Sequence, residues 1–141
     1  MVGNSTVGVL HVDDDPAMLD LTVAFLERLN TDVTLHSVTD AEEALDMVRT
    51  DSATVDVVVS DFSLPDEGGI AFLDAVREVR PDLPFIFFTG RTDTRQRALD
   101  HGATDYIVKG NAATLHDLAH TIVEVVGLAD ERECYEPEPA D

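Results

Sequence analysis

The chain has 141 residues, 44% of them hydrophobic, which is enough for one globular domain with a core of its own. Nine basic residues stand against 29 acidic ones, and the formal net charge of -20 argues against a nucleic-acid surface, because phosphates would be repelled. A single cysteine, Cys134, excludes an intramolecular disulfide and a cysteine-based metal cage.

The composition also bears on where the protein works. The first residues lack the basic stretch of a signal peptide, and no apolar run approaches the roughly 18 residues of a membrane span, so we expect a cytoplasmic protein that does not enter a membrane. Eight of the nine basic residues are Arg, and the one Lys is Lys109. Such acidity with so little Lys is typical of proteins kept soluble in concentrated salt, which makes a halophilic source a hypothesis.

The first half of the chain alternates apolar strand patterns with helical ones. An apolar run over 7–12 predicts a strand, and the following Asp13-Asp14-Asp15-Pro16 predicts the cap and first turn of a helix over about 16–29. A second strand is predicted over 33–38. Thr39-Asp40-Ala41-Glu42 then matches a capping box, with Thr39 as the cap of the next helix.

The second half continues the alternation. Val57, Val58 and Val59 form a β-branched run typical of a strand buried on both faces, and this run stops at Asp61. The later elements are a helix around 70–76, a strand over 83–88, a weak helix within 92–100 closed by Gly102, a strand over 105–108 and a last helix over 115–126.

Five strands alternating with five helices predict an α/β fold, a doubly wound five-stranded parallel sheet with helices on both faces. We expect a single domain over residues 7–127. Residues 1–6 are expected to be flexible, and residues 128–141, rich in Glu and interrupted by Pro137 and Pro139, are expected to form a disordered acidic tail.

Polar residues stand where the predicted strands end. Asp13-Asp14-Asp15 follow the first strand, Asp61 the third, Thr89 the fourth and Lys109 the fifth. The carboxyl ends of parallel strands share one edge, so these side chains are expected to meet there. Clustered carboxylates oppose one another's ionisation, and Mg²⁺ together with Lys109 would neutralise them. A phosphoryl group fits such a site, with Asp61 as its acceptor.

Four fragments carry a resemblance to a known family. Val12-Asp13-Asp14-Asp15-Pro16, Ser60-Asp61-Phe62-Ser63-Leu64-Pro65, Phe88-Thr89-Gly90 and Tyr106-Ile107-Val108-Lys109 occur in the right order at the ends of the right strands. Together they resemble the receiver domain of two-component response regulators, over about residues 6–127. The resemblance implies a flavodoxin-like (βα)5 fold and, since no output segment follows the last helix, a receiver of the stand-alone type.

The resemblance also assigns roles. Asp61 would take a phosphoryl group from a sensor histidine kinase or a phosphotransfer protein. Asp14, Asp61 and the Ser63 carbonyl would bind Mg²⁺, and Asp13 would orient the waters of the metal. The domain would catalyse only its own phosphorylation and dephosphorylation.

Two further residues would carry the signal to a downstream protein that the sequence does not identify. Thr89 and Tyr106 would form a switch pair, in which the phosphoryl group draws in the Thr89 hydroxyl and Tyr106 reorients. Receivers usually have Pro after the lysine, whereas Gly110 stands here, so the loop that holds Lys109 is expected to be less fixed.

Alternative interpretations stay open at this point. The Asp13-x-Asp15 pattern also resembles phosphohydrolases of the haloacid-dehalogenase type, which would make Asp13 the nucleophile of a small Mg²⁺-dependent enzyme. A second alternative is a pseudo-receiver that binds partners without being phosphorylated. Tyr106 could simply fill the core. The basic residues Arg91, Arg95 and Arg97 could pair locally with Asp93 and Asp100 or dock an acidic partner.

Overall fold

The sheet is the centre of the molecule. A computed structural model describes residues 6–13, 24, 32–50, 55–64, 68–110 and 112–134. Within them, five strands form one sheet in the order β2-β1-β3-β4-β5, and all neighbours are parallel. This is the strand order of flavodoxin-like doubly wound sheets, as the sequence predicts. The strands are β1 Thr6–Val12, β2 Asp32–Val38, β3 Val57–Ser60, β4 Phe85–Thr89 and β5 Asp105–Val108.

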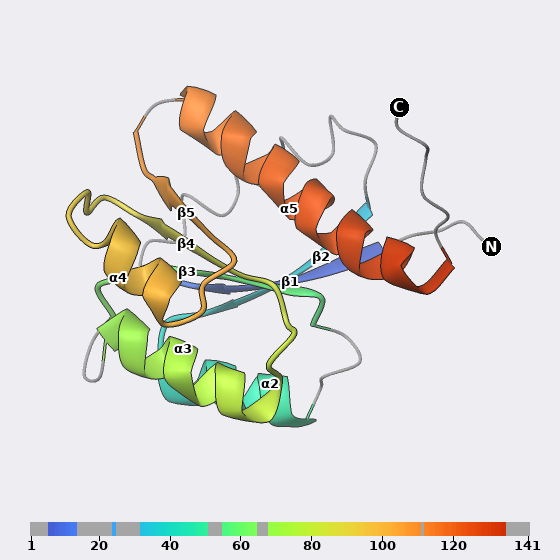
Figure 1. Cartoon of the computed structure of the whole chain (residues 1–141), viewed down its shortest axis with the longest axis horizontal. Helices are drawn as coiled ribbons and strands as arrows, with labels where there is room; N and C mark the ends of the chain where they lie inside the picture. Colours follow the sequence, from blue (N-terminus) through green and yellow to red (C-terminus); the bar gives the residue numbers. More distant parts are fainter. Residues whose placement is uncertain are drawn as a thin grey trace.

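Helices cover both faces of this sheet. Figure 1 places α2 and α3 on one side of the strands, α5 on the opposite side, and α4 beside the end of the sheet formed by β4 and β5. The helix predicted over 16–29 lies outside the described residues except for Ala24, which is helical. The other helices are α2 Ala41–Thr50, α3 Gly68–Val79, α4 Arg95–Asp100 and α5 Ala112–Cys134.

Two hydrophobic clusters lie on the two faces because successive strand residues point to opposite sides. In β1, Leu10 and Val12 join a cluster that contains residues of α2 and α3. Val7 and Val9 join a second cluster with the inner face of α5. Strands β3 and β4 are buried along their whole length, as expected for central strands covered on both sides.

The start of α2 corrects one prediction. Asp40, not Thr39, caps the helix: its Oδ1 accepts hydrogen bonds from the backbone N–H groups of Glu42 (2.9 Å) and Glu43 (3.2 Å). Because the helix begins at Ala41, the second and third helical N–H groups are the ones that a cap at position 40 can satisfy. Thr39 lies one residue too early for that geometry.

The last helix extends past Gly127, where the apolar periodicity ends, and reaches Cys134. Residues 128–134 contain Leu, Ala, Glu and Arg, whose high helix propensity favours the continuation of a helix already formed. The predicted acidic tail beyond Cys134 lies outside the described residues. Within the described part of the chain, no helix is both long and apolar enough to cross a membrane.

The loop that follows Asp61 is fixed by a close backbone contact. Gly69, in the first turn of α3, donates its N–H to the Phe62 carbonyl at 2.9 Å. A Cβ at position 69 would lie 2.7 Å from that oxygen and 2.8 Å from the ring of Phe87, so only glycine allows this approach. The preceding Gly68 has φ +86, which also favours glycine.

Candidate functional site

Asp13 and Asp61 lie side by side at the carboxyl edge of the sheet. Each stands one residue past its strand and continues a strand ladder: Asp13 donates its N–H to the Val38 carbonyl (3.2 Å), and Asp61 donates to the Val12 carbonyl (3.0 Å). The parallel pairing of β1 with both β2 and β3 therefore places the two backbones together.

Lys109 joins the two carboxylates. Its Nζ lies 2.8 Å from Asp13 Oδ2 and 3.3 Å from Asp61 Oδ2. Its backbone N–H donates to the Thr89 carbonyl at 2.8 Å, which extends the β4–β5 pairing by one residue and aims the side chain across the edge. The side chains of Asp13, Asp61 and Lys109 are 1%, 14% and 20% exposed, so Asp61 is the more accessible of the two acids.

The ammonium group is stabilised by these neighbours. Burial disfavours the charge and by itself would lower the pKa of Lys109. The hydrogen bond to Asp13 and the negative charges of Asp61 and Asp13 outweigh that cost, and they raise the pKa above its ordinary value. Lys109 is therefore a fixed positive charge at neutral pH.

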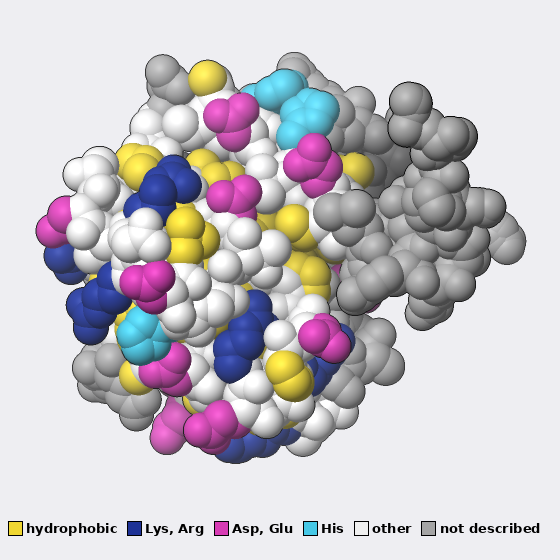
Figure 2. Space-filling model, viewed as in Figure 1, with side chains coloured by type: hydrophobic (Ala, Val, Ile, Leu, Met, Phe, Trp, Pro, Cys, Tyr) yellow, Lys and Arg dark blue, Asp and Glu magenta, His cyan; other side chains and the backbone are white. Residues whose placement is uncertain are grey.

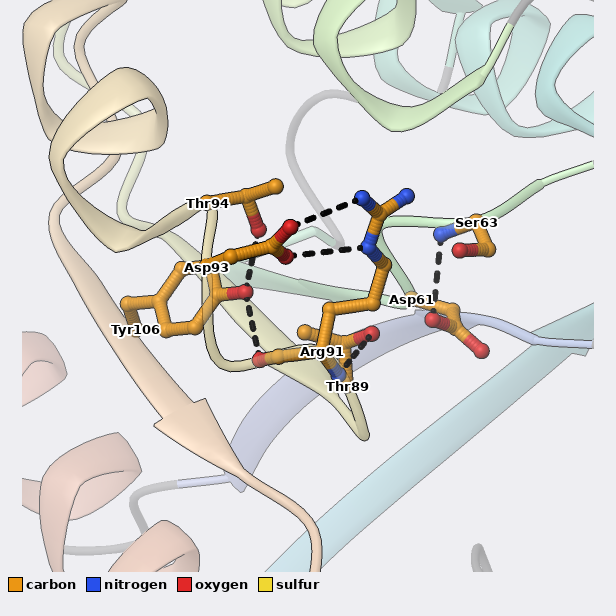
Figure 3. A network of polar contacts seen from close by, with 7 residues as sticks. All are labelled: Asp61, Ser63, Thr89, Arg91, Asp93, Thr94 and Tyr106. Atoms are coloured by element: carbon orange, nitrogen blue, oxygen red, sulfur yellow. Dashed lines mark hydrogen bonds and ion pairs between the residues drawn. The ribbon is translucent and has the colours of Figure 1, made fainter.

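The described part of the site fits a hard divalent cation. Two carboxylates of neighbouring strands supply oxygen ligands of the kind that Mg²⁺ prefers. Ser63 lies against Asp61 and donates its N–H to Asp61 Oδ1 at 3.1 Å (Figure 3). The described residues hold no group of three or more His, Cys, Asp or Glu side chains placed to bind a metal, and Asp14, the remaining predicted ligand, lies outside them.

Thr89 ends β4 and is buried at the base of the next loop. Its Oγ1 is 3.4 Å from the backbone N–H of Arg91, a long hydrogen bond. The Arg91 guanidinium pairs with both carboxylate oxygens of Asp93, at 3.3 and 3.4 Å, and lies over the ring of Phe62.

Tyr106 closes the same network from β5. Its side chain is buried, and its hydroxyl donates to the Arg91 carbonyl at 2.8 Å and shares a further hydrogen bond with Thr94 Oγ1 (Figure 3). Thr89 and Tyr106 are connected through the backbone of Arg91, whose N–H donates to Thr89 Oγ1 and whose carbonyl accepts from the Tyr106 hydroxyl. The ring of Tyr106 is also 6.1 Å from that of Phe87, so Tyr106 fills core space as well as making polar contacts.

The arginine cluster follows the local-pairing interpretation only in part. Arg91 pairs with Asp93 as expected, but Asp100 accepts from Gln96 instead. Arg95 places its guanidinium 5.4 Å from the centre of the Tyr106 ring, a contact the sequence did not indicate.

Several neighbours of the site were missed from the sequence. Phe62 and Thr94 are ordinary loop residues with no distinctive spacing, and only the fold reveals their contacts with Arg91 and Tyr106. His11 in β1 is buried, and both ring nitrogens lack a hydrogen-bond partner within the described residues. Burial, followed by the positive charge of Lys109, lowers the pKa of His11 to about 3, and the Asp61 charge opposes this shift only partly.

Comparison with known proteins identifies the architecture of this site. The family model of the response regulator receiver domain matches residues 9–120. The chain belongs to this family. The matched receiver domain contains Asp13, Asp61, Thr89, Tyr106 and Lys109.

Relatives and solved structures agree with this assignment. Two-component response regulator ORR22 of Oryza sativa is 33% identical over 145 residues, covering 94% of this chain and 20% of that protein. ARR11 of Arabidopsis thaliana is 37% identical over 111 residues, covering 76% of this chain and 21% of the relative. The receiver domain thus spans about a fifth of the length of these relatives.

Solved structures share the fold of the receiver domain. A CheY-like receiver domain protein from Methanospirillum hungatei JF-1 superposes with a TM-score of 0.74 at 29% identity, covering 91% of this chain and 99% of that one. The BeF3-activated DrrB receiver domain gives a TM-score of 0.66 at 27% identity, with 84% and 98% covered. The chain therefore has both the sequence features and the fold of a response regulator receiver domain.

Proposed function

We propose that Asp61 accepts a phosphoryl group from a phosphohistidine on a sensor histidine kinase or a phosphotransfer protein. The observation that carries this proposal is the bridge from Lys109 to both Asp13 and Asp61 at the open edge of the sheet. An Asp61 carboxylate oxygen would attack phosphorus as the bond from phosphorus to the imidazole nitrogen breaks, and the donor histidine would leave as imidazole. Such a transfer needs positioning and neutralisation of the phosphoryl oxygens more than covalent help from the protein.

Separate residues would hold the group in place. Lys109 would neutralise phosphoryl oxygens because its ammonium already lies beside Asp61 and stays charged. Asp61, Asp14 and the Ser63 carbonyl would bind Mg²⁺, with Asp13 orienting the waters of the metal. The bound metal would neutralise further negative charge on the phosphoryl group.

The burial of the two carboxylates favours Asp61 over Asp13 as the acceptor. A phosphohydrolase that used Asp13 would need this side chain to reach the substrate, yet it is almost fully covered and tied to Lys109, whereas Asp61 is partly open. A pseudo-receiver without phosphorylation is disfavoured by the paired acid and lysine, since nothing in partner binding alone requires them.

Thr89 and Tyr106 would transmit the change. A phosphoryl group on Asp61 would draw the Thr89 hydroxyl, and the shift would reach Tyr106 through the Arg91 backbone.

The output face would include α4, where basic groups gather on the left of the view in Figure 2. We infer that Arg95 and Arg97 there dock an acidic segment of a downstream protein. Charge reversal at both positions should abolish that docking and leave phosphorylation unchanged.

The decisive experiment is incubation with acetyl phosphate and Mg²⁺ followed by intact mass measurement. The wild type should gain the mass of one phosphoryl group, and Asp61→Asn should not. Peptide mapping should place the label on Asp61. A label on Asp13, with continuous release of phosphate, would instead establish the hydrolase.

A further inference from the structure

Arg91 brings a positive charge to the rim of the phosphoryl site. It lies in the loop between β4 and α4, and its guanidinium carbon is 5.5 Å from the ring centre of Phe62, the residue directly after Asp61. Figure 3 shows the Arg91 side chain extending between Asp93 on one side and the turn of Asp61 and Ser63 on the other. The guanidinium therefore lies between Asp93 and the turn that follows Asp61.

Asp93 holds this guanidinium, but only weakly. Nε and Nη2 of Arg91 each face one carboxylate oxygen, an arrangement in which the planar fork matches the acid. The two side chains are 47% and 70% exposed, so water and dissolved ions screen the attraction between them and the pair is weak. The hydrogen bond from Arg91 lowers the pKa of Asp93, so this carboxylate remains a charged competitor at neutral pH.

We propose that Asp93 is a resident competitor for the Arg91 guanidinium, which a phosphoryl group on Asp61 displaces. This inference rests on the proposed function, because the phosphoryl group supplies the competing anion. A dianionic phosphoryl group offers more charge and the same bidentate oxygen geometry, so the guanidinium exchanges one acid partner for the stronger anion. Asp93 acts only through Arg91 and is a positioning residue.

The exchange would be transmitted to the switch residue. The carbonyl of Arg91 accepts the hydrogen bond of Tyr106, and Thr94, the residue after Asp93, holds the same hydroxyl. Movement of Arg91 away from Asp93 thus acts on both hydrogen-bond partners of Tyr106. The pair couples occupancy of the phosphoryl site to the buried tyrosine.

Beryllofluoride, a stable mimic of the phosphoryl group, provides an equilibrium test. We would titrate it in the presence of Mg²⁺ and follow bound fluoride by fluorine NMR. Asp93→Ala removes the competitor and should raise the affinity by about two- to fivefold, the range of a weak surface pair. Arg91→Ala should lower the affinity, since the cation itself is lost. Asp100→Ala is the matched control: it removes one exposed carboxylate of the same helix region, which bonds Gln96 and not Arg91.

The double variant decides the mechanism. Asp93→Ala should have no effect on affinity in the Arg91→Ala background, because the competitor then has nothing to hold. An equal effect of Asp93→Ala with and without Arg91, no effect in either, or an equal effect of Asp100→Ala would overturn the inference. If the wild type shows no binding that Asp61→Asn abolishes, the proposed function fails as well. The wild-type titration alone separates these two failures.

Discussion

Lys109 and Asp13 are 96 positions apart in the sequence and form a 2.8 Å ion pair that is largely withdrawn from water. The pair exists because β1 and β5 end at the same edge of a parallel sheet, and it leaves the ammonium in contact with Asp61 as well. One lysine therefore compensates two acids, and its loss has consequences for stability as well as for phosphate chemistry.

Replacing Lys109 with Met should destabilise the metal-free protein by about 3 kcal/mol, because a buried carboxylate and its neighbour would be left without a counter-charge. Urea denaturation measures this change. Asp13→Asn should recover much of the loss when it is combined with Lys109→Met, since it removes one of the two repelling charges. Strictly additive effects of the two substitutions would contradict this account.

The pH dependence of this effect follows from the raised pKa. A group whose pKa is higher in the folded state contributes stability below its unfolded pKa and loses it only as the pH rises through the folded value. The Lys109 pKa lies above its ordinary value of 10.5. The stability difference between wild type and Lys109→Met should therefore stay constant between about pH 7 and 9.

Gly69→Ala should destabilise the domain by about 1–3 kcal/mol, because the new methyl group would overlap the Phe62 carbonyl and the Phe87 ring. The matched control is Gly90→Ala, where a Cβ would meet no atom within 4 Å. The control should change the free energy of unfolding by less than about 0.5 kcal/mol. Comparable losses in both variants would show that loss of glycine flexibility, not the close contact, is responsible.

The sequence predicted those parts of the site that depend on strand ends. Asp13, Asp61, Thr89 and Lys109 each stand at the end of an apolar strand pattern, and parallel pairing then brings them to one edge. The strand at Val57 to Val59 could be recognised from the sequence, because a strand covered on both faces has no polar positions. The alternation of strands and helices predicted a doubly wound parallel sheet, and the resemblance to receiver domains implied its flavodoxin-like fold.

The remaining features depend on three-dimensional contacts that no local pattern encodes. The sequence did not distinguish Thr39 from Asp40 as the cap of α2, because the two positions are adjacent and both residue types can cap a helix. The structure shows that Asp40 is the cap. The contact of Phe62 with Arg91 arises where two loops meet, and that of Thr94 with Tyr106 where a loop meets β5. The burial of His11 was not indicated, because a polar residue in a strand normally points to solvent.

Tyr106→Phe should lower the free energy of unfolding by about 1–2 kcal/mol, because the Arg91 carbonyl and the Thr94 hydroxyl would lose a buried partner. The substitution should not change acetyl phosphate labelling of Asp61, since the hydroxyl contacts none of the acids. Thr94→Val completes a double-mutant cycle. Its effect on the free energy of unfolding should be smaller in the Tyr106→Phe background than in the wild type. Loss of labelling in Tyr106→Phe would contradict the separation of switch and acceptor.

High salt should stabilise the protein. With a net charge of -20, self-repulsion opposes the compact state, and added ions screen it. The melting temperature should rise as potassium chloride is increased from near zero into the molar range. Equal stability at both extremes would argue against adaptation to salt.

Acid should destabilise the domain through His11. The folded state holds the pKa of His11 at about 3, well below its ordinary value of 6.5, so protons bind the unfolded chain preferentially. This contribution to stability is fully present above the unfolded pKa and is lost as the pH falls toward the folded value. Between pH 7.5 and 5 the loss should be about 2 kcal/mol, at 1.4 kcal/mol for each unit below the unfolded pKa.

Substitution of His11 isolates its contribution to the pH dependence of stability. His11→Val introduces a β-branched residue, which suits a central strand, and removes the titrating ring, so the free energy of unfolding of the variant should fall less than that of the wild type between the same two pH values. The slope with pH is the relevant quantity, because any cavity left by the smaller side chain costs the same at both. His120→Gln, exposed on α5, is the control and should retain the wild-type slope. Identical slopes for His11→Val and wild type would show that the buried ring is not the source of acid sensitivity.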